Sequence, residues 1–203
     1  MTAHAAAADA HEHHGPPEPH YSSRISPPLL GILLFIASEI MLFGAFFTAY
    51  FFVRVVNEVE VWPPEGFHRP VFVAGVNTAI LVTSSFTVHW ALQSIKRGSR
   101  VGLQAGLVLT FALGLTFLLT QMLEYSRLGF APRDGAFATT FYGLTGLHGA
   151  HVFVGLTLLG MTAIRAFRGH YTPDHHHGVE LPGIYWHFVD VMWIVVYTTV
   201  YIL

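Results

Sequence analysis

Five long apolar stretches, separated by short polar segments, set the pattern of this chain. Each stretch exceeds the roughly 20 residues that a helix needs to cross the hydrocarbon core of a bilayer. The segments between them carry proline, glycine and charged residues, which end helices or stay in water. The pattern predicts an all-α, polytopic membrane protein with a five-helix transmembrane domain at residues 28–203. The expected spans are 28–53, 71–95, 101–125, 138–165 and 181–203.

The composition agrees with a membrane protein. Of 203 residues, 53% are hydrophobic and 11% charged, and the mean hydropathy is +0.51. Soluble domains carry about 25% charged residues. The absence of cysteine excludes disulfides, thiolate metal sites and c-type haem attachment. A net charge of −2 argues against nucleic acid as a partner.

The first 27 residues differ from the rest of the chain, because they are rich in alanine, histidine and proline. We expect residues 1–27 to form a disordered cytoplasmic tail, since they have too little apolar surface to fold. The tail also lacks the basic region and apolar core of a secretory signal. An alternative role is the binding of a stray metal ion by its five histidines, which are His4, His11, His13, His14 and His20.

The distribution of positive charge predicts the orientation in the membrane, because cytoplasmic loops carry an excess of Lys and Arg. The turn at residues 96–100 has three basic residues and no acidic one. With that turn inside, six of the ten Lys and Arg lie on the inner side and four on the outer side. We therefore expect a cytoplasmic N-terminus and a C-terminus outside.

One acidic residue lies deep in the first span. Glu39 is about 11 residues from the start of the span, near the membrane midplane at a rise of about 1.5 Å per residue. A carboxyl group is costly in hydrocarbon, so Glu39 must face protein, water or lipid head groups. Two interpretations remain open. Glu39 is either a neutral, hydrogen-bonded acid at a helix contact, or a carboxyl group that handles protons or contacts lipid.

The third span carries small residues at four-residue intervals. Gly102, Gly106, Thr110 and Gly114 therefore lie on one face of the predicted helix. Small residues in membrane helices allow backbones to approach closely. This face predicts tight packing of the third span against a neighbouring helix.

Further polar residues lie within the later spans. His148 and His151 are three residues apart and share a helix face, and so do His187 and Asp190. By helix rise, His151, Asp190 and Glu39 lie at similar depths, so we expect one interhelical polar layer. Glu124 lies near the end of the third span. The predicted intramembrane polar network comprises Glu39, Glu124, His148, His151, His187 and Asp190.

Structural hydrogen bonding, a proton relay and a metal site are three possible roles for this network. Two histidines and a carboxylate are a plausible ligand set, but a third strong ligand at a clear spacing is missing. The His175–His177 triplet, beside Asp174, is expected to be a solvated loop cap or a subunit contact. The sequence shows no nucleophile–base pair and no phosphate-binding glycine loop. We therefore expect no catalytic residue, no metal site and no redox cofactor in this chain.

Several blocks of the sequence resemble one known family. In chain order they are SEIMLFGAFFTAYF, WPPEG, VNTAILVTSSFTVHWA, EYSRLGFAPRDGAFATTFYGLTGLHGAHVFVG and YWHFVDVMWIVVYTTVYI. Together they strongly resemble subunit III of haem–copper terminal oxidases, over roughly residues 28–203. Longer members of that family have seven helices. This chain resembles the shorter, five-helix bacterial form, which lacks the first two helices and with them part of a lipid-filled cleft.

The resemblance implies an accessory subunit of an aerobic respiratory cytochrome c oxidase, a proton-pumping complex of the bacterial plasma membrane. It implies that haem and copper belong to partner subunits I and II. It also implies that this chain packs on subunit I, holds structural phospholipid, and supports proton uptake and sustained turnover. Glu39 falls on the family's membrane carboxyl group and Arg165 on its lipid head-group arginine, so we expect both residues to bind lipid.

Other functions remain open beside this one. Subunit III of a quinol oxidase and an accessory protein of nitric oxide reductase have the same expected fold. WPPEG and the Ser38–Glu39 pair favour the cytochrome c branch. A function of another class is a self-standing proton channel built on Glu39, Glu124 and Asp190, although acids on three separate helices form no continuous track in the sequence.

Overall fold

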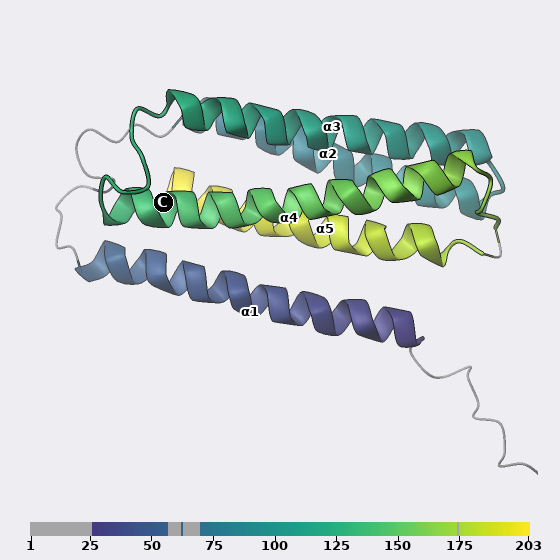
Figure 1. The fold of residues 1–203 in the computed structure, drawn as a ribbon, viewed down its shortest axis with the longest axis horizontal. Coiled ribbons are helices and arrows are strands. Elements are labelled where there is room, and N and C mark those ends of the chain that lie inside the picture. Colours follow the sequence, from purple (N-terminus) through teal and green to yellow (C-terminus); the bar gives the residue numbers. More distant parts are fainter. Residues whose placement is uncertain (1–25, 57–61, 63–69, 174) are drawn as a thin grey trace, which may run out of the picture.

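The structure is a computed structural model that describes residues 26–56, 62, 70–173 and 175–203. Its five long helices run along one common direction and form an elongated bundle (Figure 1). The predicted all-α, five-helix membrane architecture is confirmed. The predicted tail lies almost wholly outside the described residues. The helices are α1 (Pro27–Val56), α2 (Val71–Lys96), α3 (Arg100–Arg127), α4 (Ala136–Phe167) and α5 (His177–Tyr197), which continues into the π-helical turn η2 (Thr198–Ile202).

The five spans are longer than the hydrocarbon core that they cross. They contain 26 to 32 residues, so each measures about 39–48 Å at the α-helical rise. The hydrocarbon core is about 30 Å thick. Both ends of each span therefore reach into the head-group region, where charged side chains are tolerated.

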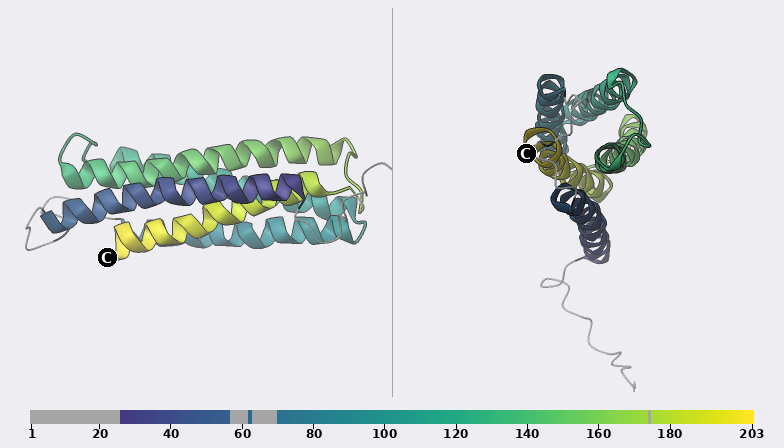
Figure 2. Two further views of the ribbon diagram at one scale, coloured as in Figure 1. Left: turned by 90° about the horizontal axis from the view of Figure 1, so that it is seen from below. Right: turned by 90° about the vertical axis from the view of Figure 1, so that its left-hand side faces the viewer.

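The helices α2 to α5 form the body of the bundle, and α1 lies against its outside (Figure 2). The main contacts of α1 are with α4 and α5. Only Phe43 and Tyr50 of α1 are buried. Within the most apolar stretch of α1, 6% of the residues are buried. Within the corresponding stretch of the α5–η2 span, 56% are buried. The α5–η2 span therefore contributes most to the core, and α1 presents most of its apolar surface outward.

The two ends of the bundle differ in charge. The start of α1, the α2–α3 turn and the α4–α5 loop lie together at one end (Figure 1). We term this the basic end, because it carries five described Lys and Arg side chains. The opposite end holds the α3–α4 loop and η2. The residues of the basic end are Lys96, Arg97, Arg100, Arg165 and Arg168.

The small-residue face of α3 packs closely on α2, as the sequence predicted. A Cβ atom added at Gly106 would lie 2.9 Å from the Cα atom of Ala91. Between the same helices, the Thr87 and Thr110 hydroxyl oxygens are 2.7 Å apart. Gly114, one turn beyond Thr110, instead receives the Trp186 ring of α5. The small-residue face of α3 therefore packs on α2 at Gly106 and Thr110, and on α5 at Gly114.

The helix α5 begins four residues before the expected start of the last span, with Pro182 inside it. Proline has no N–H group, so it cannot donate to the carbonyl group four residues earlier. That carbonyl oxygen belongs to Gly178, and it accepts from the Tyr171 hydroxyl at 3.4 Å. The Thr162 hydroxyl also lies 3.4 Å from it, but bonds more closely to the Leu158 carbonyl oxygen, at 2.8 Å. The Tyr171 hydroxyl replaces the missing backbone bond, and the helix extends through the proline.

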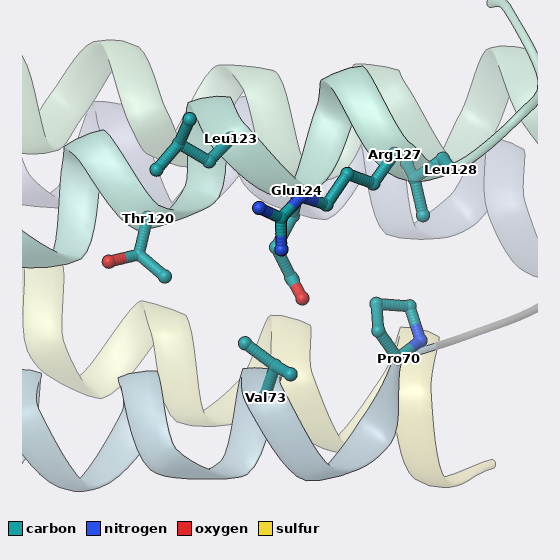
Figure 3. A pocket seen from close by; sticks show the side chains of 7 residues that line it. All are labelled: Pro70, Val73, Thr120, Leu123, Glu124, Arg127 and Leu128. Carbon is teal, nitrogen blue, oxygen red and sulfur yellow. The ribbon is translucent and has the colours of Figure 1, made fainter.

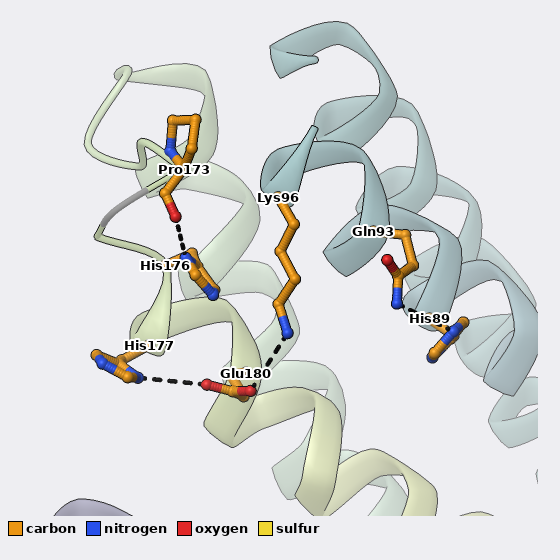
Figure 4. Close-up of polar contacts among 7 residues, drawn as sticks. All are labelled: His89, Gln93, Lys96, Pro173, His176, His177 and Glu180. Carbon is orange, nitrogen blue, oxygen red and sulfur yellow. Dashed lines mark hydrogen bonds and ion pairs between the residues drawn. The ribbon is translucent and has the colours of Figure 1, made fainter. Parts of the chain in front are cut away.

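Polar contacts join α2 to the start of α5 at the basic end (Figure 4). Lys96 Nζ lies 3.6 Å from Glu180 Oε1, and His177 Nδ1 lies 3.3 Å from Glu180 Oε2. His176 Nδ1 donates to the Pro173 carbonyl oxygen at 2.6 Å. Two of the three loop histidines thus make local contacts around the start of α5. Asp174 lies outside the described residues.

Candidate functional site

The acid of the first span pairs with a histidine of the fourth. Glu39 Oε2 lies 2.8 Å from Nε2 of His151, which joins α1 to α4 deep in the membrane. The two side chains are 15% and 11% exposed, respectively. Beyond hydrophobic contact, this pair is a polar link between the outlying helix α1 and the body of the bundle.

The hydrogen bonds of the His151 ring limit the protonation state of the pair. Nδ1 lies 2.8 Å from the Leu147 carbonyl oxygen, which can only accept, so Nδ1 carries a hydrogen. One proton must then lie between Nε2 and Glu39 Oε2. Either an imidazolium donates to a carboxylate, or a neutral ring accepts from a carboxylic acid. In both forms the pair is electrically neutral as a whole, which suits a membrane interior.

Aromatic side chains enclose the pair. The Phe43 ring lies 4.9 Å from the His151 ring, centroid to centroid. The Tyr185 hydroxyl of α5 donates to the His151 carbonyl oxygen at 3.4 Å, and the Tyr185 ring lies 6.1 Å from that of Phe35. Three helices therefore meet around His151, and the ring of Phe43 packs directly on the His151 ring.

A second polar group lies between α2 and α5. The Ser85 hydroxyl donates to Asp190 Oδ2, and its oxygen accepts from His187 Nδ1 at 3.0 Å. Asp190 Oδ1 is buried and has no hydrogen-bond partner among the described residues. Within the part of the chain that the structure describes, no hydrogen bond connects this group to Glu39 or His151. The predicted polar layer is thus divided into two groups.

His148 lies apart from both groups. It is fully buried, and neither ring nitrogen has a hydrogen-bond partner among the described residues. Its ring packs between Trp193, at 4.7 Å, and Phe117, at 5.7 Å, both measured between centroids. In this arrangement His148 fills the core between α3, α4 and α5.

Glu124 occupies the last turn of α3, at the opposite end of the bundle from the α2–α3 turn. Its side chain lies between α3 and the start of α2, beside Arg127 (Figure 3). Glu124 Oε2 is buried without a hydrogen-bond partner among the described residues. The residue therefore belongs to neither polar group of the interior.

Arg165 lies at the basic end, with Arg168 one turn on. Both are exposed and line a cavity of about 530 Å³ between the end of α4 and the start of α5. Neither guanidinium group forms an ion pair with another described residue. Tyr171 and Pro182 line the same cavity, so it combines two positive charges with apolar walls.

Ser85 and Tyr185 position the candidate residues. Nothing in the sequence pointed to Tyr185, whereas Ser85 is one of the polar residues of the second span that can bond backbone or a neighbouring helix. Ser85 connects His187 to Asp190, and Tyr185 contacts the backbone of His151. Among the residues that the structure describes, no three His, Asp or Glu side chains are grouped so that they could hold a metal ion.

These features define a polytopic helical membrane protein with small, separate polar groups inside its bundle. Comparison with known proteins identifies the family. A family model described as cytochrome c oxidase subunit III matches residues 21–203. The chain belongs to this family.

Curated relatives agree with this assignment. Cytochrome c oxidase subunit 3 of Thermostichus vulcanus is 44% identical over 176 residues, which cover 86% of this chain and 87% of the relative. The subunit of Lumbricus terrestris is 40% identical over 188 residues, covering 90% of this chain and 73% of the relative. That of Lemur catta is 39% identical over 188 residues, covering 90% and 69%.

Proposed function

We propose that this chain is an accessory, non-redox subunit of an aerobic respiratory cytochrome c oxidase. In this role it packs directly on oxidase subunit I, within a complex that also contains subunit II. Haem and copper reside in those partners. Family membership along residues 21–203 is the observation that carries the proposal. The names of the relatives favour cytochrome c over quinol as the electron donor, and a donor assay with the purified complex separates the two.

The exposed surface of α1 supports a protein partner in the membrane. Its outward side carries large apolar residues, including Met41 at 77% and Phe52 at 65% exposed. On α2, Phe72 and Phe86 are similarly exposed, at 84% and 71%. Such surfaces suit either lipid or protein, and α1 has few contacts of its own with the bundle. We propose that α1 and α2 dock on subunit I, which would complete the enclosure of α1.

The basic end supports the proposed orientation. We place the basic end, with the N-terminus, at the cytoplasmic face of a bacterial plasma membrane, and the C-terminus outside. Positive charge is enriched on the cytoplasmic side of membrane proteins. The described part of the opposite end carries fewer basic residues, namely Arg54, Arg127 and Arg133.

The role proposed for the Glu39–His151 pair is to hold α1 in place and to keep one proton within the membrane. Such a pair supports proton uptake and sustained turnover without taking part in oxygen reduction. A self-standing channel is less well supported, because the described hydrogen bonds of Glu39, Glu124 and Asp190 do not connect with one another. Reconstituted into liposomes without an oxidase, the chain should conduct no protons.

Two substitutions of Glu39 separate its hydrogen bond from its proton. The amide of Glu39→Gln can still donate to a neutral His151 ring but cannot exchange a proton, whereas Glu39→Ala loses both. We expect both variants to begin oxygen uptake at nearly the parental rate. Glu39→Ala should then lose activity over fewer turnovers, or lose the subunit from the complex. If retention of α1 is the main role, Glu39→Gln should behave like the parent; if the proton matters, it should fail like Glu39→Ala.

The measurement is oxygen uptake by the purified complex over many turnovers, with subunit content determined before and after. Thr48→Ala is a matched control on α1, because its hydroxyl bonds only to the Gly44 carbonyl oxygen of its own helix. An immediate collapse of the initial rate in an intact complex would show that Glu39 acts directly in catalysis, contrary to this proposal.

The second proposed role is phospholipid binding at Arg165 and Arg168. Guanidinium groups bind phosphate in a bidentate manner, and both lie at head-group depth. Native mass spectrometry of the Arg165→Ala variant should show less retained phospholipid than the parent. Arg133→Ala, in the α3–α4 loop, is the control. Equal lipid retention in Arg165→Ala and the parent would contradict this part of the proposal.

A further inference from the structure

A small cavity lies between α2 and α3 at the opposite end of the bundle. Its volume is about 290 Å³ (Figure 3). Ligand sites in proteins range upward from about 300 Å³, so the space suits a polar head group better than a whole lipid. The apolar part of the wall is formed by Pro70, Val73, Leu123 and Leu128.

The polar part of the wall carries one charge of each sign. Glu124 is 7% exposed, and its carboxyl group extends from α3 into the gap toward Val73 (Figure 3). Its Oε2 atom is buried and has no partner in the described part of the chain. A buried polar atom of this kind is strongly disfavoured unless a ligand or water bonds to it. Glu124 therefore points to a bound hydrogen-bond donor.

Arg127 supplies the complementary charge. Its guanidinium group lies beside Glu124, one turn further along α3 (Figure 3). The two side chains nevertheless form no ion pair with each other, and neither forms one with any other described residue. Among the described residues, neither charge is held in an ion pair, so both can contact a ligand that carries a positive and a negative group close together.

The position of the cavity along the membrane normal indicates that such a ligand would be a membrane lipid. The 28 residues of α3 measure about 42 Å, so each end extends about 6 Å beyond a hydrocarbon core of about 30 Å. Glu124 and Arg127 lie in the last turn, at the level of the lipid head groups. Leu123 and Val73, which are 58% and 40% exposed, continue the apolar wall toward the acyl chains.

We propose that the α2–α3 cavity binds a phospholipid with a primary-amine head group of the phosphoethanolamine type. The ammonium group donates to Glu124, the phosphate accepts from Arg127, and the acyl chains lie along the exposed apolar surface of α2 and α3. An anionic head group without an amine would satisfy Arg127 but leave Glu124 unpaired. A trimethylammonium group has no N–H to donate to the buried oxygen. This site is distinct from the one proposed at Arg165, which lies at the other end of the bundle.

The test is native mass spectrometry of the full chain, released from nanodiscs that contain equal amounts of phosphatidylethanolamine, phosphatidylcholine and phosphatidylglycerol. The parent should retain phosphatidylethanolamine in preference to the other two lipids. In Glu124→Gln this preference should fall about tenfold, as expected for the loss of a charge-assisted hydrogen bond. Arg127→Gln should reduce the retention of all phospholipids at the site. Each variant is also measured in the Arg165→Ala background, so that the other proposed site does not mask the result.

Matched controls lie in the α3–α4 loop at the same end. Asp134→Asn and Arg133→Gln remove the same charges without touching the cavity, and lipid retention should remain as in the parent. Equal retention of phosphatidylcholine and phosphatidylethanolamine by the parent would overturn the proposal without recourse to any variant. So would an unchanged preference in a folded Glu124→Gln protein. Binding of water-soluble phosphoethanolamine in place of the lipid would overturn the assignment to a membrane lipid.

Discussion

The closest approach between α2 and α3 gives a direct test of the helix packing. Gly106 of α3 faces the backbone of Ala91 in α2. A Cβ atom at Gly106 would lie 2.7 Å from the Cβ atom and 2.9 Å from the Cα atom of Ala91. Carbon atoms in favourable contact are about 3.5–4.0 Å apart. Gly106→Ala therefore forces the two helices apart locally by about 1 Å, because a backbone atom cannot rotate away as a side chain can.

This separation also affects a hydrogen bond four residues along. The Thr87 and Thr110 hydroxyl oxygens are 2.7 Å apart, and an added 1 Å would break their contact, at about 1 kcal/mol. Overpacking itself destabilises by about 1–3 kcal/mol. Alanine has a helix propensity about 1 kcal/mol better than that of glycine, which partly offsets these losses. We expect a net loss of about 1–3 kcal/mol, which is roughly a fivefold to hundredfold change in the unfolding equilibrium.

The assay is equilibrium unfolding of the purified protein in mixed micelles at increasing denaturing detergent, followed by circular dichroism and tryptophan fluorescence. Gly146→Ala on α4 is the control, because its added Cβ atom would meet no described atom of a neighbouring helix within 4 Å. The control should be as stable as the parent or slightly more stable. If Gly106→Ala matched the control, the two backbones would not be packed as closely as described.

Three further predictions follow from other contacts. Tyr171→Phe removes the hydroxyl donor to the Gly178 carbonyl group and should destabilise the protein by about 1–3 kcal/mol in the same unfolding assay; a stability equal to that of the parent would show that Pro182 needs no replacement donor. Glu180→Gln removes a largely solvated ion pair with Lys96, so the melting temperature should change little, with an effect below about 1 kcal/mol that disappears in high salt. Because the chain has no cysteine, the single variants Ala136→Cys and His170→Cys report the orientation in the membrane. An impermeant maleimide should label Ala136→Cys in intact cells and His170→Cys only after permeabilisation. The reverse pattern would contradict a cytoplasmic N-terminus.

Hydropathy along the chain was sufficient to predict the five membrane spans, because the free energy of moving a side chain into hydrocarbon depends mainly on that side chain. The bounds of the first four helices differ from the expected ones by at most three residues. The start of α5 differs by four, since the donor that compensates for Pro182 comes from Tyr171, outside that helix. The packing face of α3 was also visible in the sequence, since its four-residue spacing follows from helix geometry alone.

The sequence by itself thus determined the membrane-spanning architecture, the family and the positions where polar side chains enter the membrane. It identified Glu39 and His151 as residues at similar depth, but depth does not say which side chains face one another. Only the tertiary structure pairs Glu39 with His151, places Asp190 with Ser85 and His187, and leaves His148 among aromatic rings. The physical reason is that such contacts depend on the rotation of each helix about its axis and on its choice of neighbours. Both are settled by packing between distant segments, and neither can be read from one segment alone.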